Sequence, residues 1–136
     1  MKFSEIEDDK WKELAPYLDT CLLPVTGMSG LESPPKATAC LEQLRDMMDM
    51  VEIPFRGRVV TYPACHYWAD GLNFDEMLAK WCEALRSIGF TYIIVATANA
   101  TLELTCDAAD LVLRPTADGT LPQPSEVTSA IRELWS

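Results

Sequence analysis

Short apolar runs alternate with helix-like patterns along this chain, and this alternation restricts the fold more than any other feature. Cys21-Leu22-Leu23, within residues 20–25, and the segment 90–96 are apolar without in-out alternation, which is typical of strands buried on both faces. Further strands are predicted at 58–62 and 111–113. Because helices separate these strands, crossover connections should make them parallel. We therefore predict an α/β fold, a three-layer α/β/α domain with a four-stranded, mainly parallel sheet in the order 2-1-3-4.

Four segments carry the apolar repeat of amphipathic helices. Ser4 and Glu7 have the spacing of a capping box, so the first helix is expected to run from about residue 5 to residue 15, before Pro16. Asn73 and Glu76 repeat that signature. The other helices are expected at 37–51, at 73–88 with Gly89 as its stop, and from Ser125 onward, and loops are expected at 26–35 and 63–72.

The length of 136 residues fits a single domain over 1–136, and a hydrophobic fraction of 49% is sufficient for a core. No apolar run approaches the roughly 20 residues that span a bilayer. The first five residues, Met1 to Glu5, turn acidic at once instead of leading into the apolar part of a signal peptide. We therefore expect a cytoplasmic protein without membrane insertion.

Acidic side chains outnumber basic ones by 21 to 11, which gives a formal net charge of -10. Such a charge repels phosphate backbones and anionic lipid surfaces. Nucleic acid is therefore not expected as a partner.

Five cysteines without a C-x-x-C pair argue against a disulfide framework and a zinc knuckle, and favour a reducing compartment. Cys21, Cys40 and Cys82 fall in apolar patterns, so they are expected in the core. Cys65 and Cys106 lie beside predicted strand or turn ends, which leaves their exposure open.

Ligands of open parallel sheets collect beyond the carboxyl ends of the strands. Segments 26–35, 63–72 and 97–105 follow three predicted strands, but none carries a dinucleotide or nucleotide-triphosphate phosphate motif. We predict no cofactor, no metal, since one histidine cannot build a histidine-rich metal centre, and no catalytic residue. The candidate binding residues are Thr26, Ser29, Cys65, His66, Tyr67, Trp68, Asp70 and Asn99.

The segment 63–70 leaves alternatives open. Cys65 beside His66 has the composition of a nucleophile and its base, but neighbours in an extended chain point in opposite directions. The preferred interpretation is a packed aromatic loop. Tyr67 and Trp68 then either anchor a partner or fold back over the sheet edge. Asn99, in a small polar segment, is expected to cap a turn more readily than to bind a ligand.

Three stretches carry a resemblance to a known family. Residues 17–25 (YLDTCLLPV), 55–64 (FRGRVVTYPA) and 89–95 (GFTYIIV) resemble the YpiF family of short, uncharacterised bacterial proteins. The layout is also remotely similar to creatininase-type amidohydrolases, since Pro24-Val25, Pro63 and Gly89-Phe90 fit that frame. At the positions of that family's metal ligands the chain has residues 26–30 (TGMSG) and 97–101 (TANAT).

These observations lead to two functional hypotheses. The first is a non-catalytic domain with a degenerate creatininase-like fold that acts through contacts with an unknown protein partner, or with copies of itself. The alternative is a small-molecule-binding protein or an amidohydrolase-like enzyme that uses the loops at the carboxyl ends of the strands. A cleft lined by the candidate residues favours the alternative, and a flat apolar patch favours the first.

Overall fold

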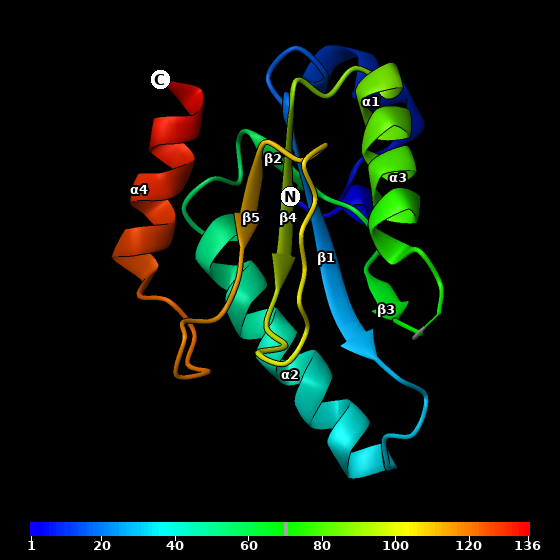
Figure 1. Ribbon diagram of the computed structural model, residues 1–136. Coiled ribbons are helices and arrows are strands. Elements are labelled where there is room, and N and C mark those ends of the chain that lie inside the picture. Colours follow the sequence, from blue (N-terminus) through cyan, green and yellow to red (C-terminus); the bar gives the residue numbers. More distant parts are fainter. Residues whose placement is uncertain (70) are drawn as a thin grey trace.

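The computed structural model describes residues 1–69 and 71–136 and shows a mixed α/β fold (Figure 1). No helix within those ranges is long and apolar enough to cross a membrane. The elements in chain order are the 3₁₀ helix η1 (Phe3–Glu5), α1 (Asp8–Leu14), β1 (Thr20–Met28), α2 (Pro34–Glu52), β2 (Val59–Thr61), β3 (Cys65–Tyr67), α3 (Phe74–Ile88), β4 (Tyr92–Thr97), β5 (Leu111–Leu113) and α4 (Pro124–Trp135).

The strands form one parallel sheet in the order β2-β1-β4-β5, and β3 also pairs with β1. The four expected strands are present, but the expected count of four is wrong. β3 adds a fifth strand within the segment 63–72 that was expected to be a loop, so the order is 2-1-4-5 with β3 beside β1. β1 is longer than expected, since it continues to Met28. This extra length is what gives β3 a strand to pair with.

The sheet separates two halves of the core. Cys21 and Leu23 point into one half, which α1 and α3 cover, whereas Leu22 points into the other, which α2 and α4 cover (Figure 1). β1 and β4 are buried almost throughout, as their apolar runs predict. The three-layer arrangement follows from this burial on both faces.

The ends of α2 and α3 follow local chemistry. The Asn73 side chain accepts a hydrogen bond from the backbone N–H of Glu76 at 3.1 Å, and α3 stops at Gly89, whose φ is 126°. Ser33 caps α2 through the N–H of Lys36. α2 therefore begins three residues earlier than expected, with two prolines in its first turn, where their missing N–H groups cost no hydrogen bond.

The first helix differs from its prediction. Ser4 lies inside η1 and does not cap a helix, and α1 begins only at Asp8 after Glu7. Ile6 between them has an extended backbone, with φ -104° and ψ 114°, and its side chain packs against the core. The helix that the local spacing favours is therefore interrupted where this partly buried side chain packs on the core.

Two ion pairs link neighbouring segments at the amino ends of the strands. Arg58, just before β2, binds both carboxylate oxygens of Asp19 at 2.9 and 3.1 Å, and its guanidinium lies 4.0 Å from the ring centroid of Trp135 in α4. Arg86 of α3 binds Asp110, just before β5, at 2.9 Å. Both sheet-covering layers are therefore attached to this edge.

The five cysteines are free thiols. Cys21 and Cys82 are buried as expected, but Cys40 is only half-buried, so its prediction as a core residue is wrong. Of the two cysteines whose exposure the sequence left open, Cys65 is half-buried and Cys106 is buried. Leu102, Leu104 and Cys106 alternate into the core, although their segment belongs to none of the strands of the described residues. This alternation places the Cys106 sulfur 3.9 Å from that of Cys82.

Candidate functional site

The end of β1 is shaped by Gly27. Its φ of 75° lies in the left-handed region, and the pairing register between β1 and β3 shifts between Val25 and Met28. A Cβ atom on Gly27 would lie 2.9 Å from Leu102 Cδ2, so the Leu102 side chain would have to shift. The loop after β4 therefore packs directly on the backbone of β1, and the positive φ favours glycine at this position.

Asn99 holds that loop in place. Its Nδ2 donates to the carbonyl of Gly27 at 3.1 Å, and its Oδ1 accepts from the N–H and the hydroxyl of Thr101 at 3.0 and 2.8 Å. The amide is thus engaged in a local turn and in a contact across 72 residues. This arrangement agrees with the expected capping role of Asn99.

Glu32 occupies a group of backbone donors after β1. The N–H of Ser29 donates to its carboxylate at 2.7 Å, the Ser29 hydroxyl at 3.0 Å, and the N–H of Gly30 at 3.0 Å. The backbone hydrogen bond from Ser29 is the main reason that the pKa of Glu32 is lowered to about 2. Ser29, a candidate binding residue, therefore already holds an internal carboxylate, and sequence reasoning missed Glu32.

β3 places Cys65 and His66 on opposite faces of the sheet. The Thr26 hydroxyl and His66 Nδ1 lie 2.9 Å apart, on an exposed stretch of β3. Cys65 instead packs against the core that α3 covers, and burial raises the pKa of its thiol to about 11. The two residues therefore do not form a nucleophile and its base, as the alternation of an extended strand predicts.

The aromatic residues of this segment have different surroundings. Trp68 is half-buried, with its ring stacked on Phe74 at a centroid distance of 3.8 Å and an interplanar angle of 27°. Its backbone N–H donates to the carbonyl of Met28 at 2.7 Å. Tyr67 is 67% exposed. Asp70, the remaining candidate here, lies outside the described residues.

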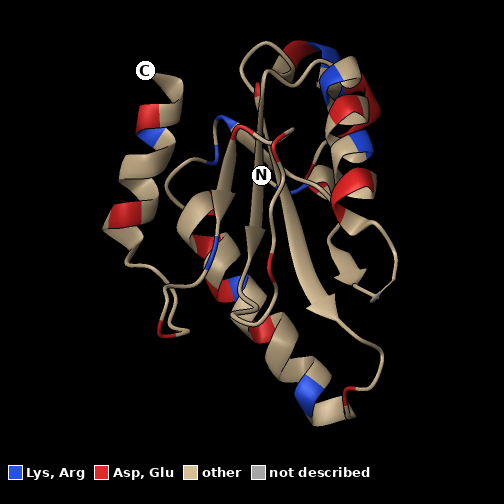
Figure 2. Cartoon of the chain, in the orientation of Figure 1, with Lys and Arg blue, Asp and Glu red and all other residues tan. Residues whose placement is uncertain are grey.

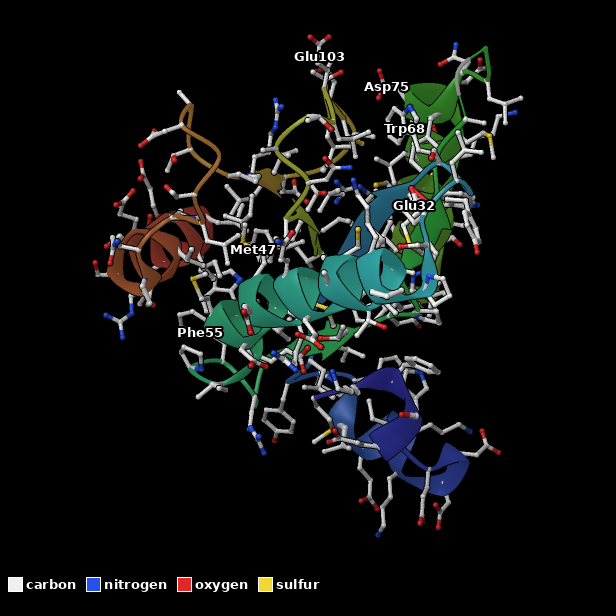
Figure 3. The ribbon with its side chains drawn as sticks, turned by 90° about the horizontal axis from the view of Figure 1, so that it is seen from below. Glu32, Met47, Phe55, Trp68, Asp75 and Glu103 are labelled. Atoms are coloured by element: carbon white, nitrogen blue, oxygen red, sulfur yellow. The ribbon has the colours of Figure 1, made fainter. Side chains whose placement is uncertain are left out.

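A cleft opens at this carboxyl edge between the loops that follow β1, β3 and β4. Figure 3 views the molecule from this side and shows Glu32, Trp68 and Glu103 on three different segments. The cleft has a volume of about 680 Å³. Its lining residues are Gly27, Ser29, Leu31, Trp68, Ala69, Asn99, Thr101, Leu102 and Glu103.

A second hollow of about 390 Å³ lies beside the cleft, toward the start of α2. It includes Thr26, Glu32 and Lys36, and it shares Gly27, Ser29, Asn99 and Thr101 with the cleft. The structure therefore brings Thr26, Ser29, Trp68 and Asn99 together. Among the described residues, Cys65, His66 and Tyr67 line neither hollow.

Sequence reasoning missed several residues of the cleft, including Leu31, Thr101, Leu102 and Glu103. Their signal was position alone, since they follow the same strand ends as the candidates. Glu103 is the one charged side chain among the described residues that line the cleft. The arrangement offers an aromatic surface, small polar groups and a carboxylate, and the described ranges contain no cluster of three metal-ligating side chains.

A family model with the description "Protein of unknown function (DUF2487)" matches residues 9–115. The chain belongs to the DUF2487 family. The DUF2487 match contains all the strands described above and the complete lining of the cleft, whereas α4 lies beyond it. No significant match exists among curated proteins or among solved structures.

Membership in DUF2487 agrees with the expectation of an uncharacterised family. The YpiF name, the bacterial origin and the creatininase-type likeness stay predictions.

Proposed function

We propose that this protein binds a small organic molecule in the cleft at the carboxyl edge of the sheet. The observation that carries the proposal is the cleft of about 680 Å³ that Trp68, Ser29 and Asn99 line together. Ligand sites are typically concave, with apolar walls and a few polar groups that orient the ligand. This cleft has that composition and lies where parallel sheets usually bind ligands.

The charge of the cleft favours a neutral or cationic ligand. Glu103 contributes a carboxylate to the lining, and the net charge of -10 adds a negative field. Trp68 offers an indole ring whose position is fixed by its stack on Phe74. A planar or cationic group is attracted to such a ring, so a flat amine fits the cleft best.

The creatininase-type likeness supports the location of this site and not a hydrolytic reaction. Residues 26–30 and 97–101, which stand at the ligand positions of that frame, contribute to both hollows. They supply hydroxyl, amide and backbone groups where a hydrolase of this type needs metal ligands. We therefore propose binding without catalysis.

Matched probes that differ in charge test the proposal. Benzylamine, benzyl alcohol and benzoate are titrated into the labelled protein, and amide shifts are followed by NMR at roughly millimolar concentrations, the range expected for fragments. We expect shifts at Gly27, Ser29 and the Trp68 indole, strongest for benzylamine and weakest for benzoate. Trp68→Ala should abolish them, whereas the control Trp11→Ala, in α1 beside Phe90, should preserve them.

The proposal is wrong if benzylamine and benzyl alcohol leave the cleft amides unshifted. It is equally wrong if the shifts persist undiminished in Trp68→Ala. Glu103→Gln separates the charge preference from binding itself, because it should reduce the preference for benzylamine over benzyl alcohol without abolishing the binding of either.

A further inference from the structure

An apolar stripe remains exposed along α3. Met77, Trp81 and Ile88 are 40%, 37% and 51% exposed, and Ala84 is exposed between them. At 100° per residue these four positions lie within a narrow sector of the helix, beside the face that packs on the sheet. An aligned row of large apolar side chains in contact with water is typical of an interaction surface.

Features at the two ends of α3 extend the stripe. At its carboxyl end, Ile88 forms part of a hollow of about 320 Å³ whose aromatic walls include Phe3, Trp11 and Tyr62. Before its amino end, Leu72 is 60% exposed. The stripe therefore has an exposed apolar side chain near one end and, at the other, a hollow with aromatic walls whose rim includes Glu7 and Asp8.

We propose that this surface is the interface of a symmetric homodimer in which the two α3 helices pack antiparallel. A two-fold axis across the centre of the stripe sets Trp81 against the partner's Ala84, and Ala84 against the partner's Trp81. The same register sets Met77 against the partner's Ile88. Each large side chain then meets a small or flexible one, which is the self-complementarity that an isologous interface requires.

The charges beside the stripe fit the same register. Lys80 and Glu83 lie on the outer flank of α3, and neither forms an ion pair within residues 1–69 and 71–136. Charges of both signs alternate along this helix (Figure 2). In antiparallel packing, equivalent flanks face one another, so Lys80 comes opposite the partner's Glu83 twice in the dimer. This pairing favours a second copy over a uniformly basic partner.

The size of the surface predicts a weak dimer. α3 has 15 residues, so its face is about 22 Å long and about 10 Å wide. That face alone is well below the roughly 800 Å² per partner of a standard stable interface. The contributions of Leu72 and of the aromatic hollow are therefore needed, and the dissociation constant should be in the micromolar range.

Sedimentation velocity on the full chain tests the proposal over roughly 1 to 300 µM, a range that brackets a micromolar dissociation constant. We expect a reversible shift from a 15.2 kDa monomer to a dimer as concentration rises. Ala84→Arg places a long charged side chain at the centre of the interface and should abolish the dimer. Ala39→Arg, the same change at an exposed position of α2, should leave it intact.

Charge reversal tests the antiparallel register separately. Lys80→Glu and Glu83→Lys should each weaken dimerisation several-fold, and the double variant should restore it. A chain that remains monomeric at all concentrations overturns the proposal, as does a dimer that survives Ala84→Arg. Failure of the double variant to recover overturns the antiparallel register, and with it the proposed dimer. These results are independent of ligand binding in the cleft.

Discussion

Gly27→Ala should destabilise the protein more than Gly30→Ala does. Two costs add at this position. The left-handed backbone costs a residue with a Cβ atom about 1–2 kcal/mol. In addition, the new Cβ would lie 2.9 Å from Leu102 and 3.1 Å from the Asn99 amide, and overpacking of this kind typically costs about 1–3 kcal/mol. The expected loss in free energy of unfolding is therefore about 2–5 kcal/mol.

Gly30→Ala is the matched control. Gly30 has a φ of 94°, but nothing lies within 4 Å of a Cβ atom built there. Gly30→Ala therefore carries only the backbone cost. Alanine also lowers the conformational entropy of the unfolded chain, and this stabilises both variants to the same extent. The difference between the two variants, about 1–3 kcal/mol, measures the contact between β1 and the loop after β4.

Urea denaturation followed by far-ultraviolet circular dichroism measures this difference. With a slope of about 1–3 kcal/mol per molar urea, a difference of about 2 kcal/mol moves the midpoint by roughly 1 M. Adding Leu102→Ala should remove most of the extra cost of Gly27→Ala, because it removes the nearest atoms. Equal losses for the Gly27 and Gly30 variants would refute the close packing of the loop on β1.

Further predictions concern other contacts of the fold. Trp68→Ala should lower the free energy of unfolding, measured by denaturation, by about 2 kcal/mol. This loss lies between those expected for a surface and for a buried aromatic residue, because the ring is half-buried and stacked. A loss below about 0.5 kcal/mol would contradict the stack. Arg58→Ala should lower the free energy of unfolding by about 1–2 kcal/mol, because it removes the ion pair with Asp19 and the contact with Trp135. Arg58→Lys should recover only part of this loss, since lysine lacks the planar guanidinium that binds both carboxylate oxygens. The lowered pKa of Glu32 makes its contribution to stability fully present above about pH 4.5 and lost as the pH falls toward about 2. Wild type and Glu32→Gln should therefore converge in stability at pH 2, and an NMR titration of this carboxyl near pH 4.5 would disprove the assignment. At pH 8, Cys65 should react with iodoacetamide roughly 100-fold more slowly than an ordinary thiol, because its pKa is about 11; rapid labelling of the folded protein would contradict its burial.

Local chemistry explains which parts of the fold were predictable. α3 follows its prediction because Asn73, Glu76 and Gly89 act within one turn of the helix ends. The first helix does not, because the backbone is extended at Ile6, whose partly buried side chain packs on the core, a tertiary contact that the spacing of the capping box does not reveal. β3 has only three residues and exists because β1 extends to meet it, and so short a segment carries no periodic signal of its own.

The candidate site was also predictable only where local sequence or topology determines it. The segments 26–35, 63–72 and 97–105 could be named in advance, because parallel strands bring their carboxyl ends to one edge. The contact between Asn99 and Gly27 joins residues 72 positions apart, so no local pattern reveals it. The contact of Glu32 with the N–H groups of Ser29 and Gly30 has a local sequence signal, since a carboxylate two residues after Gly30 can reach both groups. Whether the contact forms depends on how the turn folds back.

The two edges of the sheet are fastened unequally, and this predicts where the native structure opens first. Arg58, Asp19 and Trp135 join the layers at the amino edge, whereas at the other edge His66 and Asn99 each contact β1 through a single hydrogen bond. Hydrogen exchange reports such local openings, whose free energies are smaller than that of global unfolding. Amides around the cleft should therefore exchange while those of the amino edge remain protected, and an occupant of the cleft would change their protection more than it changes the melting temperature.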